Sequence, residues 1–261
     1  MSNLWQIIIN YFFVQISILL FICPFYFVYL YKHKNASIKN IFFNCHIEDF
    51  LSSKQANYMI YIWAGAEAIC WFIIPEFLLL LIIFLRVRNK KALLIYDILG
   101  TIAGTFLGLF ISIFLKFNIA TVPYITQSMV DQAKIWYQGL GLFGLFFQPF
   151  SGVPYKVFVA TISGFHINLF LFLILAVFIR IARYYIFYTI FVNLYPFWHN
   201  FISKNYIPIF LSGCFIFSFM FLKVYRSYGP SYTPNDDNVY IIKNIRTLLP
   251  AKLQNRSIYP P

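Results

Sequence analysis

Four long runs of apolar residues alternate with shorter polar connections along the chain. The apolar runs cover residues 4–31, 92–115, 167–192 and 206–222, and the polar connections cover residues 32–54, 116–134 and 196–205. An α-helix rises about 1.5 Å per residue, so about 20 apolar residues cross a hydrocarbon core about 30 Å thick. We therefore predict four full transmembrane helices, with Pro24 kinking or ending the first.

A further apolar stretch, residues 56–85, is interrupted by Glu67 and then by Pro75 and Glu76. An ionisable side chain within a membrane segment is costly and is by default a candidate functional group. One interpretation is a single tilted helix, kinked at the proline, with Glu76 near an interface. The two half-length apolar arms on either side of the proline favour a re-entrant helical hairpin.

The stretch formed by residues 135–165 is interrupted in the same way, by Pro149, Gly152 and Pro154. Each proline removes a backbone donor and clashes with the preceding turn, so a continuous helix is not expected here. Broken backbone at membrane depth requires surrounding protein or a water-filled cavity. We predict a second re-entrant hairpin with these three residues at its tip. Lys156 follows the tip, and it either contacts a ligand or snorkels to the interface.

The order of features around the two hairpins is repeated: a hairpin with a proline break, a polar return and a full span. Only the span at residues 92–115 separates the hairpins, so they enter the membrane from opposite faces, as in an inverted repeat. The predicted fold is an all-α polytopic membrane protein with about four full transmembrane helices and two re-entrant hairpins. We divide the chain into an N-terminal helix with its polar connection (1–55), a membrane domain (56–223) and a polar tail (224–261).

Two of the full spans carry further patterns. Gly100, Gly104 and Gly108 recur every four residues, which places them on one helix face and predicts close packing against another helix, either of this chain or of a second copy in a homo-oligomer. Arg180 and Arg183 are three residues apart and also share a face. Arginine stays charged, so inside the membrane it must snorkel or contact a carboxylate, a phosphate or water.

Composition supports a membrane protein and argues against several other classes. The chain of 261 residues is 61% hydrophobic and 11% charged, which lies far outside the range of soluble domains. The net charge of +12 comes from Lys and Arg beside the apolar runs, where they meet anionic headgroups, so we do not expect nucleic acid as a partner. No metalloprotease, hydrolase or phosphatase motif is present, and an enzyme is not predicted.

The four cysteines show no metal-ligand spacing, and no cofactor or metal is predicted. Cys45, His46, Glu48 and Asp49 form a polar group that could in principle hold a metal. A polar loop of this composition arises often by chance, so we do not assign it a site.

Several short segments resemble the DedA or VTT (SNARE-associated Golgi protein) family, nearest its YqaA-like branch. They are residues 66–76, 100–104, 152–158, 163–164 and 178–185. The Pro-Tyr-Lys of residues 154–156 together with the Arg-x-x-Arg of residues 180–183 is the most specific part, and the resemblance covers about residues 60–192. Glu76 and Ala182 depart from the family pattern, which often has Asp or a small polar residue at the first position and glycine at the second.

The resemblance implies a helical membrane domain with two facing hairpins and an activity in lipid translocation. It places the chain as a multi-pass protein of a bacterial inner (plasma) membrane, where members are linked to carrier-lipid recycling and proton-dependent membrane homeostasis. Eukaryotic members are linked to phospholipid scrambling.

We expect a flippase or scramblase for an anionic phospholipid or a polyprenyl phosphate such as undecaprenyl phosphate. Lys156, Arg180 and Arg183 would bind the headgroup, while Glu67 and Glu76 would neutralise these cations and take up protons. The alternatives are a proton-coupled transporter of small ions or solutes, and a scaffold assembled through the glycine face.

Overall fold

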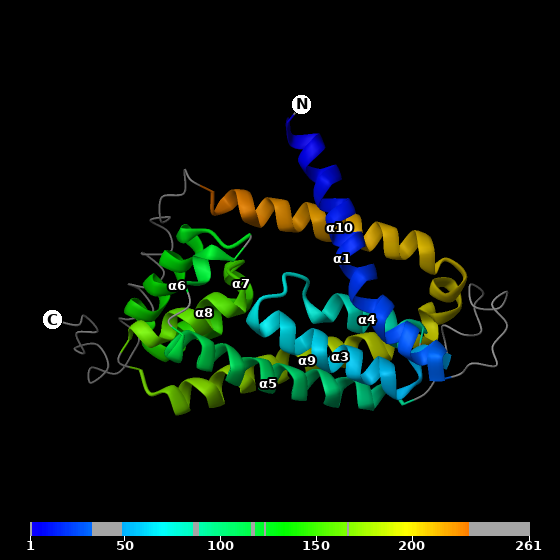
Figure 1. Ribbon diagram of the computed structural model, residues 1–261, viewed down its shortest axis with the longest axis horizontal. Coiled ribbons are helices and arrows are strands. Elements are labelled where there is room, and N and C mark those ends of the chain that lie inside the picture. The colour runs from blue at the N-terminus through cyan, green and yellow to red at the C-terminus, as the bar shows by residue number, and fades with distance from the viewer. Residues whose placement is uncertain are drawn as a thin grey trace. The chain divides into compact units, whose positions relative to one another are not determined.

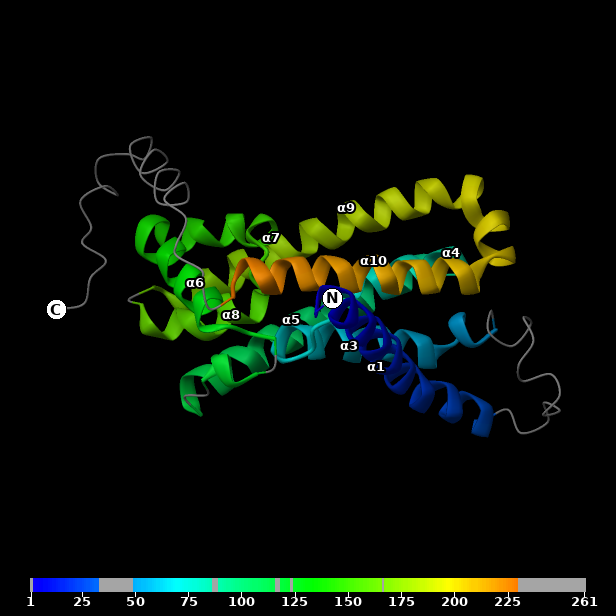
Figure 2. The same ribbon diagram turned by 90° about the horizontal axis from the view of Figure 1, so that it is seen from above.

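The computed structural model describes residues 2–32, 49–85, 89–115, 118–122, 124–165 and 167–229. Every regular element of this part of the chain is a helix (Figures 1 and 2). Four helices are long and apolar enough to cross a membrane. They are α1 (Ser2–Lys32), α5 (Lys90–Phe114), α9 (Leu169–Lys204) and α10 (Tyr206–Ser227). This confirms the prediction of an all-α fold with four helices that could span a membrane.

The remaining helices are shorter. They are α3 (Lys54–Ile69), α4 (Pro75–Leu85), η2 (Ile119–Thr121), α6 (Gln127–Leu140), η3 (Gly141–Phe147), α7 (Gln148–Ser151), α8 (Tyr155–Thr161) and η4 (Ile162–Gly164). At about 1.5 Å per residue, the 11 residues of α4 reach only about half-way across a hydrocarbon core of about 30 Å.

Both predicted helix breaks are present. α3 ends at Ile69 and α4 begins at Pro75, so the interpretation of this stretch as one kinked helix is wrong. The second break lies between α7 and α8, where Gly152 has a left-handed backbone with φ of 72°. A left-handed φ is strained for residues with a Cβ atom, and glycine adopts it without this penalty.

The first helix runs through Pro24 to Lys32, close to the predicted end at residue 31, so Pro24 does not end it. Two other expected boundaries differ from the structure. α9 continues through Pro196, where a polar turn was predicted, because one lost backbone hydrogen bond bends a long helix without necessarily ending it. α6 begins inside the predicted polar connection because Thr126 caps it, its Oγ1 accepting a hydrogen bond from the Met129 amide at 3.3 Å.

The described residues group into two compact units that do not follow chain order. Unit 1 takes its residues from Met1–Glu67, Ile73–Ile102 and Arg180–Leu222, and unit 2 from Ala68–Phe72, Ala103–Ile179 and Lys223–Pro261. The apolar core of unit 2 is built around Tyr137, Val157 and Phe158, which are fully buried. The core of unit 1 includes Trp63 and Ile73, also fully buried.

Large apolar side chains stay exposed along the four long helices. Leu20, Phe27, Phe106, Phe178 and Phe219 each expose half or more of their surface. A soluble monomer rarely exposes apolar area on this scale, whereas hydrocarbon is a favourable environment for these side chains.

Candidate functional site

Five ionisable side chains from four helices of unit 1 interact with one another, and we call them the charge cluster. They are Glu67 from α3, Glu76 from α4, Asp97 from α5, and Arg180 and Arg183 from α9. All but Arg183 are buried. Four of the five were predicted as site residues from their positions in apolar sequence.

The more deeply buried pair joins Arg180 to Glu67. The Nη2 group of Arg180 donates a hydrogen bond to Oε2 of Glu67, and the two side chains are 3% and 8% exposed. The same Nη2 donates to the Tyr184 hydroxyl at 2.6 Å, and Oγ1 of Thr101 donates to that hydroxyl at 3.1 Å. The Arg180 guanidinium is therefore held from α3 and by the tyrosine one turn along its own helix.

The second pair is more accessible. The Nε atom of Arg183 lies 2.6 Å from Oε1 of Glu76, and the arginine side chain is 24% exposed. Pro75 opens α4 and Glu76 follows it in the first turn, where the positive end of the helix dipole favours a carboxylate. Arg183 is thus the cation of the cluster with the most exposed surface.

Asp97 is the member of the cluster that sequence reasoning missed. It is fully buried on α5, one turn before Thr101, and interacts electrostatically with both glutamates and both arginines of the cluster. A lone acid inside the apolar run at residues 92–115 is the signal that marks it, and it is the same signal that identified Glu67.

Lys156 belongs to unit 2, and its ammonium group contacts the non-helical backbone between α3 and α4. Lys156 is buried on α8, and its Nζ donates a hydrogen bond to the carbonyl oxygen of Trp71, in the break after α3. The ammonium also lies 5.5 Å from the ring centroid of Tyr124, whose hydroxyl donates to the Cys70 carbonyl. These contacts give hydrogen-bond partners to two carbonyls in the non-helical segment between α3 and α4.

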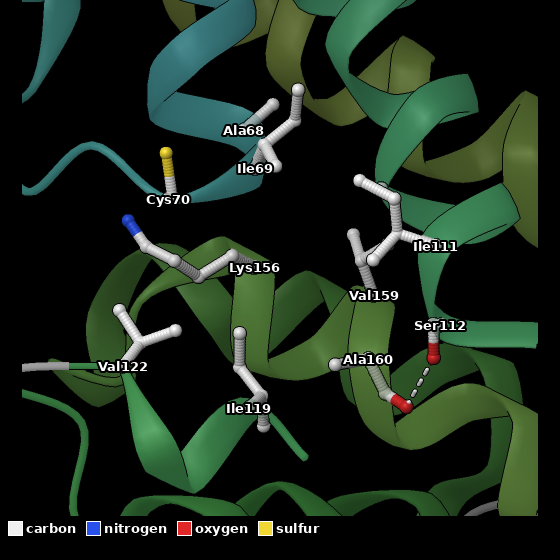
Figure 3. Close-up of a pocket in the computed structure, with 11 residues that line it drawn as sticks. Ala68, Ile69, Cys70, Ile111, Ser112, Ile119, Val122, Lys156, Val159 and Ala160 are labelled. Atoms are coloured by element: carbon white, nitrogen blue, oxygen red, sulfur yellow. Dashed lines mark hydrogen bonds between the residues drawn. The ribbon is translucent and has the colours of Figure 1, made fainter. Parts of the chain in front are cut away.

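A cavity of about 210 Å³ in unit 2 lies beside Lys156 (Figure 3). Its walls are mostly apolar, and Figure 3 shows the lysine side chain extending toward Cys70 while Ile111, Ile119 and Val159 line other walls. The volume is below the range of about 300–1,000 Å³ typical of pockets that enclose whole drug-sized ligands. A cavity of this size has room for a small group and not for a whole drug-sized molecule.

At the predicted tip of the second hairpin, side chains form hydrogen bonds with backbone groups. Pro149 lies in the first turn of α7, and Pro154 directly precedes α8, as Pro75 opens α4. Nε2 of Gln148 donates to the Val153 carbonyl at 3.2 Å. This is the kind of compensation that broken backbone needs away from bulk water.

The glycine face packs within the chain at two of its three positions. A Cβ atom on Gly100 would lie 2.1 Å from the backbone oxygen of Tyr61, so α3 and α5 touch through backbone atoms here. A Cβ on Gly108 would lie 3.4 Å from the Val159 side chain, and Gly104 is buried. The homo-oligomer expected as one use of this face stays a prediction.

The polar group considered for a metal falls largely outside the described residues, since only Asp49 of its four members is described. Within the described part of the chain, no three His, Cys, Asp or Glu side chains are grouped so that they could hold a metal ion.

Compared with known proteins, the chain matches no family model, no curated protein and no solved structure.

Proposed function

We propose that this chain translocates an anionic lipid, either a phospholipid or a polyprenyl phosphate, across a membrane. The observation that carries the proposal is the charge cluster, in which two guanidinium groups pair with carboxylates inside a helical membrane protein. Buried charges of this kind are expensive in a membrane and typically mark a substrate or ion pathway. A purely structural role would be served as well by apolar residues of similar volume.

The two ion pairs suit exchange with a phosphate. A guanidinium presents planar paired donors that match carboxylate and phosphate oxygens equally, so an incoming headgroup can replace a glutamate as the partner of an arginine. Arg183 is the first contact in this proposal, because it is 24% exposed and its partner Glu76 lies at the start of a short helix. Arg180, held by two partners, contributes mainly to the electrostatic potential that the headgroup meets.

The short helices support a re-entrant path. α4 and α8 have 11 and 7 residues and each begins at or directly after a proline. Half-length helices of this kind are a feature of transporters built from inverted repeats. The resemblance to the DedA or VTT family points in the same direction. Lys156, beside its apolar cavity, is proposed as a further cation that the lipid meets during its passage.

Reconstitution into liposomes tests this proposal. We expect wild-type protein to expose fluorescent phosphatidylglycerol, or a fluorescent undecaprenyl phosphate analogue, from the inner leaflet to an external quencher. The double variant Glu76→Gln/Arg183→Gln removes both charges of the accessible pair together, and we expect it to fold but to move lipid at least about tenfold more slowly. The matched control is Asp131→Asn/Lys134→Gln, which removes an exposed pair and should keep the wild-type rate.

Two results would contradict the proposal. One is wild-type vesicles that move neither lipid faster than protein-free vesicles. The other is an unchanged rate in the Glu76/Arg183 double variant. A proton flux through wild-type vesicles that needs no lipid movement would favour the proton-coupled ion or solute transporter instead.

A further inference from the structure

We infer that Asp97 is the resting proton-binding site of the charge cluster, and that its proton controls whether an anion can bind there. This goes beyond the expectation that Glu67 and Glu76 take up the proton. The inference rests on the proposed function only where it assigns the proton an effect on anion binding. Whether the proton is present can be measured without any transport.

The surroundings of Asp97 point to a neutral side chain. Its side chain is fully buried, and within the described part of the chain neither carboxylate oxygen has a hydrogen-bond partner. Glu67, by contrast, accepts a hydrogen bond from Arg180. Glu76 also has no hydrogen-bond partner among the described residues, but its Oε1 forms an ion pair with Arg183 at 2.6 Å, and Asp97 has no such pair. An ionised carboxylate with no partner is disfavoured in a buried site and becomes neutral instead, whereas each of the two glutamates has an arginine that compensates its charge.

The balance of charge in the cluster also points to one bound proton. The groups that face Asp97 are Glu67 from α3, Glu76 from α4 and the two arginines of α9, together with the neutral hydroxyl of Tyr184. Three carboxyl groups therefore face two guanidinium groups. One proton makes the cluster neutral, and the unpartnered carboxyl is the place where that proton is held.

The consequence for binding follows from the sign of the remaining charge. With Asp97 protonated, the cluster is neutral and a phosphate can exchange with Glu76 on Arg183. With Asp97 ionised, the cluster has one excess negative charge, which repels an incoming anion and competes for the arginines. Proton and anionic headgroup therefore bind together, and headgroup affinity rises as pH falls. Asp97→Asn keeps the neutral state at every pH, so its headgroup affinity should lose this pH dependence.

Infrared spectroscopy of the purified protein in detergent, with no lipid substrate added, tests the proton directly. At about pH 7 we expect the carbonyl stretch of a protonated, buried carboxyl group. Carbon-13 labelling of aspartate side chains should shift this band, labelling of glutamate side chains should not, and Asp97→Asn should remove it. Asp131→Asn, at an exposed aspartate, is the matched control and should leave the band unchanged.

The charge balance adds a second set of expected results. The double variant Glu76→Gln/Arg183→Gln keeps one excess carboxyl and should keep the band, whereas Arg183→Gln alone should about double it. If Asp97→Asn does not fold, Asp97→Ser provides the same test. A missing band in the wild type, or a band that shifts with labelled glutamate, would overturn the inference. Because none of these measurements reads lipid movement, a failed translocation assay leaves the result intact, and a failed proton assay leaves translocation open.

Discussion

At the scale of single residues, the two ion pairs differ in burial and so in what they can do. The Arg180 and Glu67 side chains are almost inaccessible, while Arg183 exposes 24% of its surface. A buried pair gives little net stability, but removal of one partner leaves a charge that neither water nor protein compensates. A single substitution at Arg180 therefore tests the structural role of its ion pair. A single substitution at Arg183 tests the binding of the headgroup.

We expect Arg180→Met to destabilise the protein by about 3–5 kcal/mol near neutral pH, because Glu67 loses its cation. The loss should shrink at acid pH, since a protonated glutamate carries no buried charge. The measurement is the midpoint of thermal unfolding in detergent at about pH 8 and at about pH 5. The double variant Glu67→Gln/Arg180→Met should recover most of the stability. A loss that is the same at both pH values, or that the second substitution does not reduce, would show that Arg180 acts through packing and not charge.

The sequence identified most members of the charge cluster, but not how they pair. Glu67, Glu76, Arg180 and Arg183 are recognisable because each interrupts apolar sequence. The partners Glu67 and Arg180 are 113 residues apart, and only the packing of α3 against α9 determines which acid meets which base. Asp97 was missed because it lies in an otherwise uniform span, with no proline beside it to draw attention.

At the scale of helices, the breaks were predictable and some of the ends were not. Proline and glycine act through local backbone geometry, so the interruptions near Pro75 and Gly152 could be located from sequence. Whether α9 ends at Pro196 or only bends depends on the residues around it, and the segment predicted as a polar turn contains Phe197, Trp198, Phe201 and Ile202 among its polar residues. The start of α6 depends on a single cap at Thr126 inside a polar segment.

We expect Gly100→Ala to be clearly destabilising, because the new methyl group would lie 2.1 Å from the Tyr61 oxygen and α3 and α5 would have to separate. Overpacking of this kind typically costs about 1–3 kcal/mol. Gly108→Ala is the matched control on the same helix, where the nearest atom is a side-chain carbon at 3.4 Å and helix propensity favours alanine by about 1 kcal/mol. The measurement is thermal unfolding in detergent, with size-exclusion chromatography of each variant.

Equal stability of the two variants would mean that α3 and α5 do not touch at Gly100. If Gly108→Ala keeps its stability but changes the oligomeric state, that part of the glycine face contacts a second copy of the chain.

At the scale of the whole molecule, the predicted inverted repeat depends on the side of the membrane from which each broken segment enters. The supporting features are local: two helix breaks, a proline at or directly before the helix that follows each break, and α5 as the single long helix between them. The direction from which each broken segment enters the membrane depends on the bilayer. The predicted direction of entry follows from the number of full crossings that precede each segment. Accessibility of flanking residues to a water-soluble reagent measures this direction.

We expect the ends of each hairpin to be reachable from one face of the membrane, and the two hairpins to be reachable from opposite faces. The exposed positions Lys54 and Asn89 flank the first hairpin, and Gln127 and Ser163 flank the second. In a variant without the native cysteines, Gln127→Cys and Ser163→Cys should react with an impermeant maleimide from the same side, and Lys54→Cys and Asn89→Cys only from the other. Reaction of Gln127→Cys and Ser163→Cys from opposite sides would make this segment a full crossing. The chain would then have an additional crossing, α9 would run in the opposite direction, and the two halves would no longer be related by inversion.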